Sequence, residues 1–312
     1  MRRLMEILFI SALALSACGG GPATDSGTPF NSTQGESASV ILTSTTFLAD
    51  IVRNVAGDRV TVESLLSAGA DPHEYQAVPS DVQRISKSTL VMLNGLDYDQ
   101  FIQPLLDAQR TGGTRLVITA SDGLEARQMP EENGETVTDP HMWMAPTRVI
   151  KYVENIRDGL IQVDPGGEDV YKANAEVYVS QLNELNVWIK QQVAQIPQER
   201  RLLVTNHDSL GYFAEQYGFT VIGTIIPGIS SEAAPSAQQI AALIDKIKST
   251  GALAVFLNVS DNPQLADQIA AETDIKVVTN LYIETLSPSD GPAATYIDMI
   301  KYDVSQIVNA LK

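Results

Sequence analysis

Histidine is rare in this sequence, and two of its three histidines occur in the same tripeptide. The segment AGADPHEYQAVPSD contains Asp71-Pro72-His73, and the segment TDPHMWMAP contains Asp139-Pro140-His141. Average composition would produce even one such tripeptide by chance in about one chain in a hundred of this length. Proline fixes its own φ and restricts the residue before it, so each imidazole follows a stiff stretch of backbone. Because neutral imidazole is the commonest metal ligand, the repeated tripeptide indicates a metal site.

The third histidine, His207, lies in the segment VTNHDSLGYF, directly after a run that is typical of a strand. His73 also lies in a loop that follows an expected strand. In open parallel sheets, ligands bind outside the carboxyl ends of the strands. A loop histidine taken alone is more often exposed or hydrogen-bonded than a ligand, but the three taken together favour metal binding. We therefore expect them to meet in a cleft between two lobes.

The aspartates of the two tripeptides have two open interpretations. In the first interpretation, Asp71 and Asp139 shape a turn and have no further role, because Asp-Pro favours turn formation. Either carboxylate can also accept a hydrogen bond from an imidazole and orient the ring toward a metal.

The overall charge excludes one class of function. The formal net charge is −17, whereas a nucleic-acid-binding protein needs a basic surface. An acidic chain is compatible with a protein that works near cations. The segment HEYQA begins like the HExxH helix of a metalloprotease, but Ala77 stands where the second histidine is required. Since there is also no GxSxG motif and no P-loop, a zinc hydrolase is the weakest of the alternatives.

The N-terminal segment is typical of a bacterial lipoprotein precursor. Arg2 and Arg3 precede an apolar run from Ile7 to Leu15, which is too short to span a bilayer and predicts a signal peptide over residues 1–17. Small residues precede Cys18, the single cysteine of the chain, and the stretch resembles a lipobox. We expect Cys18 to carry lipid; the alternative is ordinary cleavage that leaves an unused thiol. Residues 18–38 are rich in Gly, Ser and Thr and predict a flexible tether.

The rest of the chain alternates short apolar runs with amphipathic stretches, which predicts parallel sheets covered by helices. Expected strands before the middle of the chain are Val40–Leu42, Val60–Val62, Leu90–Leu93 and Leu116–Ile118, with helices over Phe47–Val55, from Asp81 with Ser80 as its cap, and over Tyr98–Gln109. Expected strands after Pro197 are Leu202–Thr205, Val221–Ile226, Ala254–Leu257 and Lys276–Val278, with helices over Leu210–Tyr217 and Ser236–Ser249, near Pro263 and from Tyr296 to Leu311.

Between these two series, a long helix is predicted from Glu168 to Ile196. The stretch contains no Gly or Pro, and its apolar residues recur at spacings of 3 and 4. Its expected length is about 43 Å at 1.5 Å per residue, which favours a rod between two lobes. We therefore predict an α/β fold with an N-terminal lobe (39–165), a linking helix (166–198) and a C-terminal lobe (199–312).

Several stretches of the chain resemble the metal-binding lipoproteins of bacterial ABC importers for zinc and manganese, known as the cluster A-I or cluster 9 solute-binding family. The matching stretches are ILTSTTFLADIVRNVAGDRV, LLSAGADPHEYQAVPSDV, LVMLNGLDYD, DPHMWMAP, NHDSLGYFAEQYG and APSAQQI. The resemblance implies two α/β lobes joined by one rigid helix. It also implies an extracytoplasmic, lipid-anchored monomer that captures metal between the lobes and delivers it to a membrane permease.

The resemblance further implies a set of ligands. His73 and His141 would come from the first lobe and His207 from the second. The fourth family ligand is a carboxylate after the last strand, where Glu284 fits best and Asp290 is the alternative. The other nearby acids, such as Glu74 and Asp208, are expected to stay solvated or to support a ligand.

Three imidazoles and one carboxylate favour Zn2+, because manganese prefers sites richer in oxygen. Four protein ligands fill a tetrahedral shell and leave no position for an activated water, which favours capture over hydrolysis. Mn2+ is the alternative cargo. The resemblance adds that manganese-binding members more often carry a carboxylate where His207 stands, while many zinc members have a histidine-rich insertion that the segment SDGLEARQMPEENGETVTDP lacks.

Two further expectations concern behaviour. Release is expected to follow the loss of Glu284 or His207 from the metal shell when the second lobe shifts, with only modest lobe motion. A surface adhesin is the remaining alternative function, since an anchored lipoprotein faces outward.

Overall fold

The structure is a computed structural model that describes residues 39–109, 115–130 and 136–312. The expected signal peptide (1–17), the lipidation site Cys18 and the tether (18–38) lie outside the described residues. None of the described helices is both long enough and apolar enough to cross a membrane.

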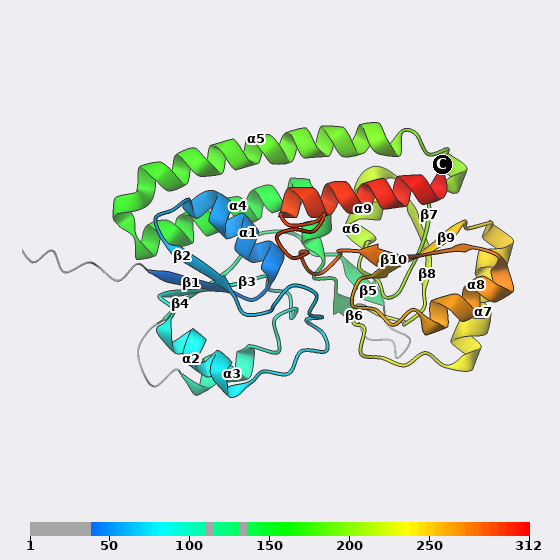
Figure 1. Cartoon of the computed structure of the whole chain (residues 1–312), viewed down its shortest axis with the longest axis horizontal. Coiled ribbons are helices and arrows are strands. Elements are labelled where there is room, and N and C mark those ends of the chain that lie inside the picture. The colour runs from blue at the N-terminus through cyan, green and yellow to red at the C-terminus, as the bar shows by residue number, and fades with distance from the viewer. Residues whose placement is uncertain (1–38, 110–114, 131–135) are drawn as a thin grey trace, which may run out of the picture. The chain divides into compact units, whose positions relative to one another are not determined.

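The first parallel sheet has the strand order β2-β1-β3-β4. Its strands are β1 (Val40–Thr43), β2 (Thr61–Ser64), β3 (Leu90–Leu93) and β4 (Leu116–Thr119). Successive residues of a strand face opposite sides, so Leu90 and Met92 pack toward α1 (Thr46–Ala56), whereas Val91 and Leu93 pack toward α2 (Pro79–Lys87) and α3 (Gln103–Ala108). Helices on both faces explain why β3 is apolar throughout; Figure 1 shows these layers. We call this sheet and its helices the first lobe.

The second parallel sheet has the order β10-β9-β7-β8. Its strands are β7 (Leu202–Thr205), β8 (Thr220–Thr224), β9 (Ala254–Asn258) and β10 (Lys276–Leu281). Val255 and Leu257 face α7 (Ala237–Thr250) and α8 (Gln264–Thr273), and the opposite face packs toward α6 (Gly211–Tyr217) and α9 (Tyr296–Leu311). We call this sheet with α6, α7 and α8 the second lobe.

Two helices follow each other between the lobes, α4 (Pro146–Val163) and the long α5 (Glu168–Val193). The predicted stripe of α5 is buried and comprises Tyr171, Ala175, Tyr178, Leu182, Leu185, Ile189 and Val193. α5 packs on α1, α4 and α9, so that α9, the last element of the chain, runs beside it (Figure 1). One continuous apolar cluster includes Phe47 and Trp143 before α5 and Phe213 and Tyr296 after it. The lobes therefore share a core beneath α5 and α9.

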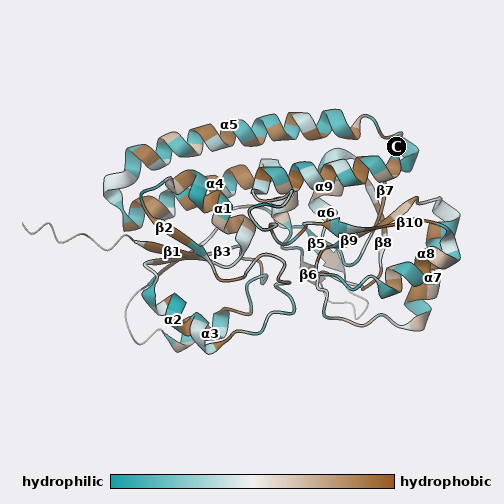
Figure 2. Cartoon of the chain, in the orientation of Figure 1, coloured by the Kyte–Doolittle hydropathy of each residue, from teal (hydrophilic) through white to brown (hydrophobic). Residues whose placement is uncertain are grey.

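The hydropathy of the chain follows these layers. Figure 2 shows hydrophobic residues along the strands of both sheets, while the covering helices carry both hydrophobic and hydrophilic residues. The short 3-10 helices are η2 (Met142–Met144), η3 (Pro165–Gly167) and η4 (Gln198–Arg200). The predicted fold class, with two helix-covered parallel sheets and a long helix between them, is confirmed.

Several predicted boundaries were wrong. α2 begins at Pro79, where the carboxylate of Asp81 accepts a 2.8 Å hydrogen bond from the backbone N–H of Val78, so Ser80 lies inside the helix and is not its cap. The helix expected from Tyr98 begins only at Gln103, because the chain first turns through Leu96 and Asp97, whose φ angles are positive at 57° and 62°.

Other boundaries moved by a few residues, and one element was missed. β2 starts at Thr61, α5 ends at Val193, and β10 continues to Leu281. The acidic segment before the second Asp-Pro-His contains an antiparallel pair, β5 (Gln128–Pro130) with β6 (Thr136–Thr138). Neither strand has the apolar alternation that identifies a strand in the sequence.

Candidate metal centre

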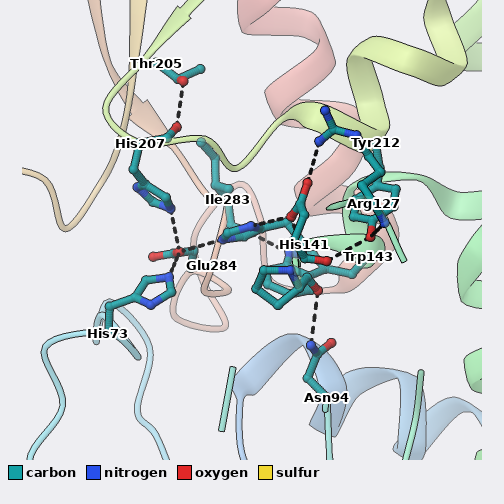
Figure 3. A network of polar contacts seen from close by, with 12 residues as sticks. His73, Asn94, Arg127, His141, Trp143, Thr205, His207, Tyr212, Ile283 and Glu284 are labelled. Carbon is teal, nitrogen blue, oxygen red and sulfur yellow. Dashed lines mark hydrogen bonds and ion pairs between the residues drawn. The ribbon is translucent and has the colours of Figure 1, made fainter. Parts of the chain in front are cut away.

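Four side chains from four separate loops converge between the two lobes. His73, His141, His207 and Glu284 each offer a ligand atom, and these atoms lie within 4.8 Å of one another. Figure 3 shows the three imidazoles directed at the carboxylate of Glu284. Its Oε1 lies 3.0 Å from Nε2 of His73, 3.1 Å from Nε2 of His207 and 3.5 Å from Nε2 of His141. Donors around a tetrahedral ion with bonds of about 2.0–2.1 Å are separated by about 3.3 Å, so this spacing suits a small cation.

The strands explain why these residues meet. His207 follows β7 and Glu284 follows β10, so both lie at the carboxyl edge of the second sheet. His73 lies in the loop after β2, and His141 lies just before η2. The centre thus occupies the position expected for ligands of parallel sheets.

The site is buried and its charges are coupled. The side chains of His141 and Glu284 are fully buried, that of His207 is 1% exposed, and that of His73 is 10% exposed. Burial opposes ionisation of Glu284, but the charges of His207 and His73 outweigh it and hold the pKa of Glu284 well below its usual value. Burial also opposes a charged His141, yet hydrogen bonds to Asp139 and Glu284 raise the pKa of His141 to about 9. The carboxylate is therefore stabilised by positive charge, which a metal ion can supply in place of protons.

A buried carboxylate orients the ring of His141. Oδ1 of Asp139 lies 2.9 Å from Nδ1 of His141 and accepts a 3.0 Å hydrogen bond from its backbone N–H. The other oxygen accepts a 2.5 Å hydrogen bond from Arg127, and Tyr212 donates to the backbone carbonyl of Asp139. When Nδ1–H donates to Asp139, Nε2 is left with a lone pair for a cation. The second tripeptide thus combines a turn with an imidazole support.

The first tripeptide is built differently. Oδ1 of Asp71 accepts a 2.8 Å hydrogen bond from the backbone N–H of His73, and Oδ2 accepts a 2.7 Å hydrogen bond from Ser231 of the second lobe. Asp71 therefore shapes the turn and reaches across the cleft, and it bonds to the backbone of His73. The identical tripeptides hold their histidines by different means.

The loop that carries Glu284, residues 282–286, is held by both lobes. The side-chain oxygen of Asn258 accepts a 3.0 Å hydrogen bond from the backbone N–H of Ile283. The indole N–H of Trp143 donates a 2.8 Å hydrogen bond to the Ile283 carbonyl. On the far side of Glu284, Thr285 Oγ1 accepts from the backbone N–H of Gly69 at 2.9 Å. These supports could not be predicted from the sequence, because an indole or an amide side chain carries no sequence signal for its tertiary partner.

The remaining candidates lie away from the centre. Asp290, the alternative to Glu284, is exposed, as is Glu74, and Asp208 is partly buried outside the four-residue group. Burial raises the pKa of Asp208, with the charge of Asp139 adding to the effect. The structure thus brings together the three predicted histidines and Glu284, and it leaves Asp290 in solvent.

Comparisons with known proteins identify the family of this chain. Residues 41–310 match the family described as zinc-uptake complex component A, periplasmic. The chain is 34% identical to the manganese-binding lipoprotein MntA of Halalkalibacterium halodurans over 100% of this chain and 99% of MntA. It is 27% identical to the manganese ABC transporter substrate-binding lipoprotein PsaA of Streptococcus anginosus over 98% of this chain and 97% of PsaA.

A solved structure shows the same fold. The manganese-bound periplasmic metal binding protein of Candidatus Liberibacter asiaticus aligns with a TM-score of 0.77 at 30% identity, covering 88% of this chain and 100% of that chain. Its two-lobe arrangement corresponds to the two sheets described above. The chain therefore belongs to the family of metal substrate-binding proteins of ABC transporters, whose members are binding proteins and not enzymes.

Proposed function

We propose that this chain captures one divalent transition-metal ion with His73, His141, His207 and Glu284 and delivers it to the permease of an ABC importer. The observation that carries the proposal is the convergence of three imidazole Nε2 atoms on one buried carboxylate oxygen. Four protein donors close a shell in which no position is reserved for a substrate or a reactive water. Such a site suits capture and transfer of the ion itself.

Two observations bear on the identity of the cargo. The donors of the site, three nitrogens and one carboxylate, favour Zn2+, and the affinity order of divalent metals places Zn2+ above Mn2+ for a given site. The names of the relatives MntA and PsaA point to manganese. Oε2 of Glu284 has no hydrogen-bond partner among the described residues, so the carboxylate is free to bind through both oxygens, as an oxygen-seeking ion prefers. We therefore propose Mn2+ as the transported ion and Zn2+ as the tighter competitor.

Metal titration of the purified chain tests the proposal. We expect one ion per chain by calorimetry, displacement of bound Mn2+ by Zn2+, and a loss of affinity of at least about 100-fold in His141→Ala, which removes a ligand. Asp290→Ala is the matched control, because its side chain is exposed and outside the group. A stoichiometry near zero, or equal effects of the two substitutions, would contradict the assignment.

The cellular location rests on the relatives and on the N-terminal sequence. MntA and PsaA are named lipoproteins, and we propose that Cys18 likewise anchors this chain as a monomer outside the cytoplasm. Detergent phase partition of the Cys18→Ser variant tests the anchor: the variant should move to the aqueous phase, and retention with the membranes would argue against it. A separate adhesion role stays a prediction, because no described contact surface bears on it.

A further inference from the structure

A cavity adjoins the metal centre on the side of His73. Its volume is about 410 Å³, and it is lined by Tyr75, Tyr98 and Phe101 from the first lobe and by Ile229, Ser230 and Glu232 from the second. Of the four converging side chains, His73 alone lines this cavity, and it is also the most exposed of them. An ion that leaves the centre through the cavity therefore passes His73 first.

A hydrogen bond between the lobes lies beside the same opening. Ser231 is 8% exposed, its chain neighbours Ser230 and Glu232 line the cavity, and its Oγ donates to Oδ2 of Asp71 at 2.7 Å. The other oxygen of Asp71 accepts from the backbone N–H of His73 at 2.8 Å. One carboxylate thus connects the backbone of His73 to the opposite lobe.

Two of the other ligands, His141 and Glu284, have additional restraints. The ring of His141 is fully buried and bonded to Asp139, and the loop of Glu284 is bonded to Trp143 of the first lobe and to Asn258 of the second. Separation of the lobe rims at this opening would break the bond between Ser231 and Asp71, and with it the restraint on the backbone of His73. This differs from the expectation that Glu284 or His207 leaves first when the second lobe shifts, because the loop of Glu284 is bonded to both lobes.

We propose that the hydrogen bond from Ser231 to Asp71 is a strap that keeps His73 over the bound ion and sets the rate at which the ion leaves. The inference rests on the proposed function. Asp71 and Ser231 are positioning residues, since they act through His73. Removing the strap should leave the entry of metal and the fold of the metal-free protein nearly unchanged, and it should shorten the residence time of the ion.

The test compares Ser231→Val with Ser231→Thr in the full chain. Valine and threonine have nearly the same shape, but only threonine keeps the hydroxyl donor. We expect the dissociation rate of Mn2+, measured by stopped flow against excess chelator, to rise about 10- to 150-fold in Ser231→Val, the range for a hydrogen bond to a charged group. Ser231→Thr should stay near the wild-type rate. Ser230→Ala is a second control, because it changes a residue that lines the same cavity and keeps the bond from Ser231 to Asp71. The hydroxyl of Ser230 accepts a hydrogen bond from the backbone N–H of Glu232.

The readouts separate the strap from a general structural role. The association rate and the melting temperature of the metal-free protein should change little in Ser231→Val, because neither depends on holding His73 over an ion. Equal dissociation rates for the Val and Thr variants would overturn the strap while leaving the proposed function intact. A parallel rise in Ser230→Ala would also overturn it, since that variant keeps the bond. A wild-type chain that takes up neither Mn2+ nor Zn2+ would instead overturn the proposed function.

Discussion

His141 and Glu284 show how one buried pair can be prepared for a metal ion. The ring of His141 lies between two carboxylates, those of Asp139 and Glu284. In the metal-free protein these raise the pKa of His141 to about 9 against the opposing effect of burial. The ring is therefore protonated at neutral pH, and a metal ion must displace that proton in order to bind.

This gives a prediction about pH. Protons compete with the metal for His141 at every pH below its raised pKa. Metal affinity should therefore rise from pH 7 to pH 9 and fall progressively below pH 7. At pH 7.5 we expect about one proton to be released per ion bound. Calorimetry in two buffers of different ionisation enthalpy measures this release directly.

Asp139→Asn is the matched comparison for proton release. The amide keeps the size of the side chain but removes the charge that raises the pKa of His141. Proton release at pH 7.5 should therefore decrease in this variant. A wild-type protein that binds metal at pH 7.5 with no net proton release would contradict a raised pKa for His141.

The residues of the centre differ in how far the sequence predicted them. The histidines stand out because there are only three, and two share a tripeptide. Glu284 is one of 38 acidic residues, so it was identified through the family resemblance and not through its own context. Ser231 and Asn258 carry no local signal, because their roles come from partners far away in the chain.

At the scale of elements, hydrophobic periodicity predicted which strands and helices exist, and side-chain contacts decided where they end. The stripe of α5 was predicted in full because each of its residues packs into one core. α3 was predicted too long, because Leu96 and Asp97 adopt positive φ angles that their residue types do not indicate, and the turn that begins at Gly95, with a φ of 91°, continues past Tyr98. The β5–β6 pair was missed because it is short and largely polar.

α9 contains a buried carboxyl group, that of Asp303, from which we predict how stability depends on pH. Asp303 is 2% exposed, its Oδ1 accepts a 2.8 Å hydrogen bond from the backbone N–H of Tyr282, and its Oδ2 has no partner among the described residues. Burial raises the pKa of Asp303 well above its usual value, and the hydrogen bond from Tyr282 only partly opposes this. A carboxyl group whose pKa is raised by folding stabilises the protein below its unfolded pKa, and this stability is lost as the pH rises through the folded pKa.

Asp303→Asn should therefore stabilise the protein at pH 8, by about 1 kcal/mol or more, because the amide keeps an acceptor for Tyr282 and cannot ionise. At pH 4 the two proteins should be nearly equal, since Asp303 is then neutral. Denaturant unfolding at the two pH values measures the difference. Asp290→Asn, which alters an exposed acid, should show no comparable dependence on pH. A variant less stable than the wild type at pH 8 would argue against an ionisation penalty at this position.

At the scale of the whole molecule, the sequence predicted two lobes and a linking helix, but it did not predict how they are joined. The alternation of strands and helices is a local property and could be read along the chain. The return of α9 to pack along α5 and α1 is a contact between distant segments, and no pattern within α9 reveals its partner. The shared core under these helices is therefore a result that only the structure provides.

That shared core links the abundance of the protein to its cargo. Because the lobes have one core in common, they should unfold together, and an ion bound at their junction stabilises both at once. Free metal at 1,000 times the dissociation constant adds about 4 kcal/mol to the free energy of unfolding, a large part of the 5–15 kcal/mol that is usual for a folded protein. A cell starved of metal would then hold a receptor that opens to proteases more often, so the turnover of the chain would itself report the metal supply.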